Sequence, residues 1–96
     1  MVCFPAAFTI PTGELHWSIL NRSLAINNQL FITTCSPARN KDASYHCYGH
    51  SMVTNPMGIV MTEFKESSES RIVVIDIQEC KKTQKHIPIL DSTKYL

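Results

Sequence analysis

The sequence predicts an α/β fold, in which β-rich runs alternate with helical stretches along the chain. Three observations support this prediction: an amphipathic stretch over residues 14–28, β-branched runs at 30–35 and 71–77, and a turn motif at 55–58 between two short β-rich runs. The 96 residues make at most one small domain. With 44% hydrophobic and 18% charged residues, the composition is that of a folded domain, since disorder requires fewer apolar residues.

The N-terminal part is predicted to hold a short strand followed by a helix. Residues 1–4 are expected to form a buried strand that Pro5 stops, because proline cannot donate a hydrogen bond to a ladder. A helix from about residue 14 to 28 follows, with Thr12 as its N-cap and the Glu14 carboxylate in its first turn. Its apolar arc exceeds that of a one-sided surface helix, so a second surface should cover part of it. The arc contains Leu15, Trp17, Ile19, Leu20, Leu24 and Ile26.

A strand, a loop and a hairpin are predicted next. The β-rich run at 30–35 forms a strand, and the polar residues 36–47 form a loop. Two strands at 50–54 and 59–64 then make a hairpin. The Asn-Pro-Met-Gly sequence at 55–58 joins them, since proline presets one turn position and glycine accepts a positive φ.

The last part of the chain is predicted to contain a buried strand and a short polar helix. After a serine- and glutamate-rich loop at 65–70, four consecutive apolar β-branched residues predict that the strand at 71–77 is buried on both faces. A helix at 78–86 should end before Pro88, because the residue before a proline disfavours helical geometry. Residues 89–96 are expected to be a tail.

Charge and cysteine usage exclude several classes of partner. The net charge of +1 gives no basic patch for nucleic acid. No apolar run approaches the roughly 18–20 residues needed to cross a bilayer, so we predict no membrane partner. The first residues do not form a signal peptide, and the four cysteines form no Cys-x-x-Cys pair, which favours reduced thiols. These observations predict a cytoplasmic protein, or a mitochondrial one if an upstream targeting segment exists.

Cys47 and His50 offer a thiol and an imidazole three residues apart. A zinc site would need two further ligands, and the other histidines are scattered. A dyad of Cys35 or Cys47 with His50 is the catalytic alternative, although nothing places either thiol at a helix N-terminus, where its pKa would fall. The preferred interpretation is structural, with His50 making a hydrogen bond at the start of a strand. We therefore predict no metal, no cofactor and no catalytic residue in this chain.

Two groups of short motifs carry a resemblance to a known family. The first group is Phe4-Pro5-Ala6-Ala7-Phe8, Thr12-Gly13 and His16-Trp17, and the second is Cys35-Ser36-Pro37-Ala38-Arg39, Ser44-Tyr45, Gly49-His50-Ser51 and Asn55-Pro56-Met57-Gly58. In this order and spacing, they resemble the C-terminal part of a carbon–nitrogen hydrolase of the nitrilase superfamily. The omega-amidase branch is the most similar. The resemblance extends from Met1 to about Pro88.

The resemblance implies a partial α-β-β-α sandwich and an amidase activity. Family members hydrolyse amides with a cysteine nucleophile, a glutamate base and a lysine that stabilises the oxyanion, all within their first two thirds. Residues 1–96 are therefore expected to be a C-terminal fragment that lacks these side chains and is inactive alone, with Met1 either a true start or an internal residue. The implied reaction is hydrolysis of small dicarboxylic acid monoamides such as 2-oxoglutaramate, releasing ammonia. The alternative is a non-catalytic remnant that pairs with a full-length homologue.

The resemblance also implies a substrate-binding segment and a partner surface. Ala7, Phe8 and Thr9 follow a predicted strand end, where open α/β layers place ligands, and they match the floor of the family's substrate pocket. Plain core packing is the equally weighted alternative for Phe8. The helix at 14–28 is expected to form a homo-oligomer or to bind a homologue, with Trp17 as a buried anchor.

Overall fold

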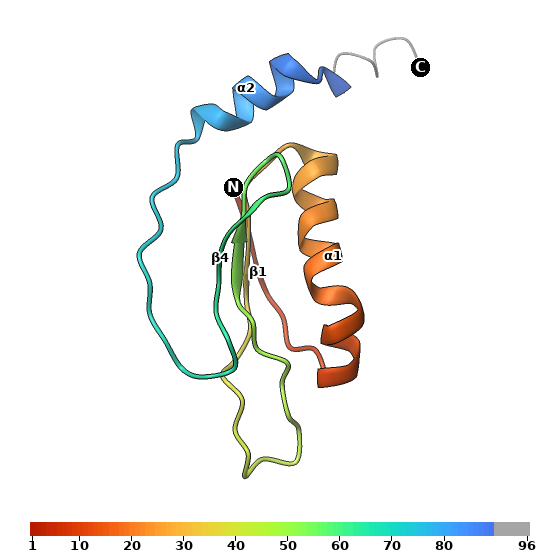
Figure 1. The fold of residues 1–96 in the computed structure, drawn as a ribbon, viewed down its shortest axis with the longest axis vertical. Helices are drawn as coiled ribbons and strands as arrows, with labels where there is room; N and C mark the ends of the chain where they lie inside the picture. Colours follow the sequence, from red (N-terminus) through yellow and green to blue (C-terminus); the bar gives the residue numbers. More distant parts are fainter. Residues whose placement is uncertain (90–96) are drawn as a thin grey trace.

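The computed structural model describes residues 1–89 and contains one four-stranded sheet with two helices (Figure 1). In chain order, the elements are β1 (Val2–Pro5), α1 (Ile10–Asn28), β2 (Ile32–Cys35), β3 (Met52–Thr54), β4 (Val60–Glu63) and α2 (Gln78–His86). The strands lie in the order β1-β2-β3-β4, with β1 and β2 parallel and the other neighbours antiparallel. This mixed arrangement confirms the predicted α/β class.

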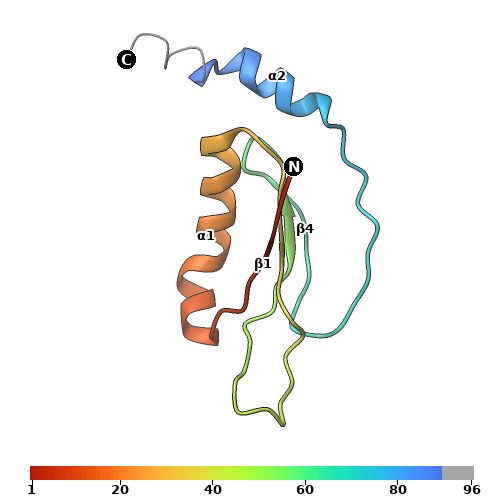
Figure 2. The ribbon, with the colours of Figure 1, turned by 180° about the vertical axis from the view of Figure 1, so that it is seen from behind.

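The helix α1 lies along one face of the sheet, and the core sits between them (Figure 2). Four buried residues spaced four apart, Gly13, Trp17, Asn21 and Ala25, turn toward the sheet. The Asn21 amide is satisfied there, since it donates to the Trp17 carbonyl at 2.8 Å and accepts from the Thr34 hydroxyl at 2.7 Å. Small and hydrogen-bonded residues thus let the helix approach the strands closely.

The start of α1 differs from the prediction. The helix begins at Ile10, and Thr9 rather than Thr12 occupies the N-cap position. Pro11 lies in the first turn, where its missing N–H removes no hydrogen bond. The Glu14 carboxylate consequently lies beyond the first turn. The prediction was wrong because it took Pro11 as a residue outside the helix.

The predicted apolar stripe of α1 is correct at Trp17 and wrong at its other members. Trp17 is buried, whereas Leu20 and Leu24 remain exposed, as do the residues expected to widen the arc. The buried positions are instead taken by glycine, asparagine and alanine. The arc is therefore wider than the sheet can cover, as the sequence predicted.

The strand β1 is exposed, and the prediction that it is buried was wrong. All four of its residues are accessible, because β1 is an edge strand whose only strand neighbour in the described chain is β2. Pro5 is the last residue of β1, whereas the sequence predicted a strand over residues 1–4 that Pro5 would stop. An edge position tolerates proline, since the missing N–H interrupts no central ladder.

The hairpin and the second helix agree with the prediction, whereas the strand at 71–77 does not form. The Gly58 N–H closes the turn on the Asn55 carbonyl at 2.9 Å, and Gly58 has a φ of 81°. The helix α2 occupies the predicted residues 78–86.

Residues 71–77 enter no ladder of the described chain, and Ile72 and Val74 are 97% and 85% exposed. A buried strand needs neighbours on both sides, and no strand of the described chain follows β4. Of the predicted tail, residues 90–96 lie outside the described residues. In the described part, neither helix has the length and apolar character needed to span a bilayer.

Candidate functional site

Two connecting segments meet at the carboxyl ends of the parallel strands β1 and β2. The segment after β1 and the loop after β2 are joined by two hydrogen bonds: the Tyr45 hydroxyl donates to the Ala7 carbonyl at 3.0 Å, and the Tyr48 N–H donates to the Phe8 carbonyl at 2.8 Å. Both segments leave the same edge of the sheet because the two strands run in the same direction. The carboxyl edge of parallel strands is where α/β folds commonly bind ligands, so this junction is the candidate site.

The three residues predicted to bind substrate lie side by side in this junction. Ala7 is exposed, and Phe8 is half-buried with its ring edge-on to Trp17 at a centroid distance of 5.0 Å. Thr9 serves as the N-cap of α1 and pairs with Cys47 in an isolated antiparallel bridge. Part of the Phe8 ring therefore packs on the core, while the rest is accessible to a ligand.

His50 connects the loop to the end of β4. Its Nδ1 lies 3.1 Å from a carboxylate oxygen of Glu63, its Nε2 lies 3.8 Å from Glu66, and its ring stacks on Tyr48 with centroids 4.1 Å apart. Its carbonyl accepts a hydrogen bond from the Trp17 indole N–H at 2.7 Å. These contacts are those of a residue that holds the loop against β4, although His50 lies two residues before the start of β3 and not in the strand.

Neither candidate dyad is assembled. Within residues 1–89, no hydrogen bond joins the thiol of Cys35 or Cys47 to His50. Cys35 is exposed at the end of β2, and Cys47 is buried beside Thr9. The same part of the chain contains no group of three or more potential metal ligands.

Arg39 organises the loop, and sequence reasoning assigned it no role. Its Nε donates to the Cys47 carbonyl at 2.9 Å, and Nη2 donates to the Tyr48 carbonyl at 3.0 Å. Its backbone N–H donates to the Glu66 carbonyl at 2.8 Å. The sequence signal for this role was an arginine within a polar loop, since a guanidinium can donate to several carbonyls at once. Arg39 thus holds three segments together at the site.

The surroundings of Tyr48 raise the pKa of its phenol. Burial raises its pKa above the ordinary 10.0, and the negative charges of Glu63 and Glu14 raise it further, while Arg39 opposes them. The ring also lies over Gly13, where any Cβ would overlap it. The close contact with α1 therefore requires glycine at that position, and it fixes the Tyr48 ring beside the junction.

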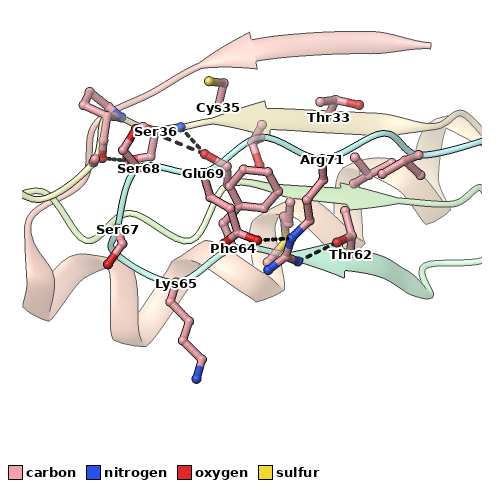
Figure 3. Close-up of a pocket in the computed structure, with 17 residues that line it drawn as sticks. Thr33, Cys35, Ser36, Thr62, Phe64, Lys65, Ser67, Ser68, Glu69 and Arg71 are labelled. Carbon is pink, nitrogen blue, oxygen red and sulfur yellow. Dashed lines mark hydrogen bonds and ion pairs between the residues drawn. The ribbon is translucent and has the colours of Figure 1, made fainter.

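A separate cavity lies on the open face of the sheet, opposite α1 (Figure 3). Its volume is about 300 Å³. Residues from β2, β3, β4 and the segment after β4 line it, among them Thr33, Cys35, Val53, Phe64 and Arg71. The predicted residues Ala7, Phe8 and Thr9 are not part of its lining, so the cavity and the junction are distinct features of the described chain.

Comparisons with known proteins agree on one family. The family model described as carbon-nitrogen hydrolase matches residues 3–85. The chain is 38% identical over 92 residues to the omega-amidase NIT3 of Saccharomyces cerevisiae and 41% identical over 91 residues to the human omega-amidase NIT2. These matches cover 96% and 93% of this chain and 32% of each relative.

Solved structures give the same result. The crystal structure of Saccharomyces cerevisiae Nit3, a member of branch 10 of the nitrilase superfamily, superposes with a TM-score of 0.82 at 39% identity, covering 91% of this chain and 32% of that one. The Caenorhabditis elegans NitFhit protein superposes with a TM-score of 0.86 at 31% identity, covering 93% and 22%. The chain thus spans about a third of the length of the curated relatives it matches.

Proposed function

Since the chain belongs to the carbon–nitrogen hydrolase family, we propose that it forms the C-terminal part of an omega-amidase-type hydrolase. The proposed reaction is hydrolysis of small dicarboxylic acid monoamides, such as 2-oxoglutaramate, with release of ammonia. Relatives that are named omega-amidases support it, because they align over more than nine tenths of this chain.

The proposed contribution of the chain is one wall of the substrate pocket. This proposal rests on the junction, where the loop after β2 contacts Ala7, Phe8 and Thr9. The partly accessible Phe8 ring lies there beside backbone groups, at the carboxyl end of the parallel strands. By resemblance, the cysteine, glutamate and lysine of the reaction come from polypeptide outside these residues. We therefore expect residues 1–96 alone to be inactive.

The first test measures ammonia release from 2-oxoglutaramate by the purified chain. No release above the buffer rate is expected. Turnover that disappears when Cys35 or Cys47 is replaced by serine would contradict the proposal, because it would reveal a nucleophile within the chain itself.

A second test places residues 3–85 in the yeast omega-amidase NIT3, in exchange for its matching segment. The chimera should hydrolyse the amide, and Phe8→Ala should lower its kcat/KM by about tenfold, because a misplaced substrate loses the reactive geometry. Ile59→Ala is the control, since Ile59 is 61% exposed in the turn between β3 and β4, at the opposite end of the sheet from the junction. Equal kcat/KM values for the two variants would show that Phe8 only packs.

The alternative proposal is a non-catalytic partner that binds a full-length homologue through residues 14–28. The exposure of Leu15 and Ile19, each 65%, on the outer side of α1 favours this alternative. Trp17, which the sequence predicted as the anchor of this interface, is not available to a partner, because it is 2% exposed within its own chain. Leu15 and Ile19 take its place in the proposal.

Co-purification with a full-length homologue tests this partner surface. Ile19→Lys should weaken binding by about 2 kcal/mol, as expected for an apolar residue at the centre of an interface. Ser18→Lys is the control, since Ser18 is an exposed neighbour on the same helix. Undiminished binding of Ile19→Lys would exclude this face as the interface.

A further inference from the structure

Arg39 joins the beginning of the loop after β2 to its end. Residues 36–47 form no helix or strand, and they project beyond the sheet at the end where α1 begins (Figure 1). Such a loop loses conformational entropy when it takes one path, so its position depends on specific contacts. The half-buried Arg39 makes a backbone bond to the Glu66 carbonyl and two side-chain bonds, which go to the Cys47 and Tyr48 carbonyls. Arg39 therefore fixes where the loop ends.

The Arg39 side chain reaches the Phe8 segment through a single peptide group. Its Nε donates to the Cys47 carbonyl at 2.9 Å. That carbonyl belongs to the same planar peptide group as the Tyr48 N–H, which donates to the Phe8 carbonyl at 2.8 Å. A hydrogen bond from a charged donor is stronger than a neutral one, and it polarises the peptide group so that its N–H becomes a better donor. The guanidinium thus strengthens the bond that holds the Phe8 carbonyl.

The second side-chain donor of Arg39 fixes the orientation of Tyr48. Nη2 donates to the Tyr48 carbonyl at 3.0 Å, so the guanidinium binds the peptide groups on both sides of this residue. Two donors of one planar group set the angle between those peptide groups, which the point charge of a lysine does not do. Another link from the loop is the bond of the Tyr45 hydroxyl to the Ala7 carbonyl, and water can replace it because Tyr45 is 49% exposed. Arg39 is therefore the stronger of these two links.

We propose that Arg39 is a positioning residue for the amidase reaction, which holds Phe8 at the substrate pocket through the peptide group between Cys47 and Tyr48. The inference rests on the proposed function, in which Phe8 forms part of the pocket wall. The Nε and Nη2 donors of Arg39 are taken up by backbone carbonyls, so Arg39 acts on the loop and not on the substrate. Its removal should therefore lower activity only where the Phe8 ring is present.

Amide hydrogen exchange in the full chain measures this link directly, without any activity. In Arg39→Ala the Tyr48 amide should exchange at least about tenfold faster than in the parent, as expected for local opening. The Gly13 amide, which is bonded at 2.8 Å within the start of α1, should keep its rate. An unchanged rate at Tyr48 would overturn the proposal. Equal acceleration at Gly13 would also overturn it, because Arg39 would then hold the whole chain together and not the Phe8 segment.

Arg22 supplies a matched control for the loss of an arginine. Its Nε also donates to a backbone carbonyl, that of Gly58 at 2.8 Å, but this bond lies at the turn between β3 and β4. Arg22→Ala should therefore leave exchange at Tyr48 unchanged. Arg39→Lys keeps the positive charge and loses the two-pronged geometry, so it should accelerate exchange at Tyr48 as Arg39→Ala does. Full protection of the Tyr48 amide in Arg39→Lys would show that charge alone suffices, against the proposal.

A double-mutant cycle in the chimera with yeast NIT3 tests whether Arg39 acts through Phe8. Arg39→Ala alone should lower kcat/KM by about tenfold, as Phe8→Ala does. In the Phe8→Ala background it should cause less than about a twofold further loss, because no ring is left to position. Two independent losses that multiply would overturn the inference and leave the proposed function intact. A Phe8→Ala chimera as active as its parent would instead refute the pocket assignment on which the inference rests.

Discussion

Truncation of Trp17 should destabilise the chain more than any other single change in α1. We expect Trp17→Ala to cost about 4 kcal/mol, within the roughly 3–5 kcal/mol typical of buried tryptophan truncation. The ring is 2% exposed and makes T-shaped contacts with the rings of Phe8 and Tyr48, at centroid distances of 5.0 and 6.4 Å. The indole N–H also satisfies the His50 carbonyl, so this substitution separates α1 from both segments of the junction.

The contributions of the ring and of its N–H can be separated with a second variant. Trp17→Phe retains most of the ring but leaves the His50 carbonyl without its donor. The loss of one partly buried hydrogen bond should cost about 1–3 kcal/mol. Leu20→Ala on the same helix is the control, and because Leu20 is 46% exposed it should cost less than about 1 kcal/mol.

Urea unfolding followed by far-ultraviolet circular dichroism is the appropriate assay, because the chain has one tryptophan and its fluorescence disappears in these variants. The expected order of stability is parent, Leu20→Ala, Trp17→Phe, Trp17→Ala. A cost of Trp17→Ala no greater than that of Leu20→Ala would refute the reasoning, since it would mean that Trp17 does not connect α1 to the sheet.

Three further predictions concern the junction and residues 71–77. Gly13→Ala should destabilise the chain by about 1–3 kcal/mol in urea unfolding, because overlap with the Tyr48 ring outweighs the better helix propensity of alanine. In a Tyr48→Ala background the same substitution should carry no such cost, because the overlapping ring is gone. The raised pKa of Tyr48 means that the folded state holds its proton more tightly, so the stability of the parent should fall as the pH rises past about 10. Tyr48→Phe should lose less stability between about pH 8 and pH 11, and an equal loss would contradict the assignment. Replacing Ile72 and Val74 together with lysine should increase the monomer fraction in gel filtration, because both side chains are almost fully exposed.

The parts of the fold set by neighbouring residues were predictable from sequence. The turn at 55–58 and the helix at 78–86 carry their own signals, a glycine that accepts positive φ and a proline beyond the helix end. The exposure of residues 71–77 was not predictable, because the same β-branched run is buried or exposed according to which strands lie beside it. The prediction of where α1 starts failed for a related reason, since Pro11 suits both a turn and the first turn of a helix.

The candidate site was predictable at its centre and not at its edges. Ala7, Phe8 and Thr9 follow a strand end, and the rule for strand ends placed them at the carboxyl edge of the sheet. The carbonyl contacts of Arg39 depend on how a long loop returns to the sheet, and no residue spacing encodes that path. Whether Phe8 contacts substrate stays a prediction.

The mixed pairing of the sheet has a consequence for the order in which the chain folds. The antiparallel strands β3 and β4 are joined by a short turn, whereas β1 reaches its parallel partner β2 only after the whole of α1. Local pairs form before distant ones, because closing a longer loop costs more conformational entropy. We therefore expect substitutions at Asn55 to slow folding and substitutions at Val2 mainly to speed unfolding in stopped-flow measurements.

If β1 joins last, the edge that it covers on β2 stays open through most of the folding reaction. An open, uncharged strand edge pairs readily with another chain, so misassembly competes with folding at this edge more than elsewhere. The speed with which β1 reaches β2 would then govern the yield of folded chain.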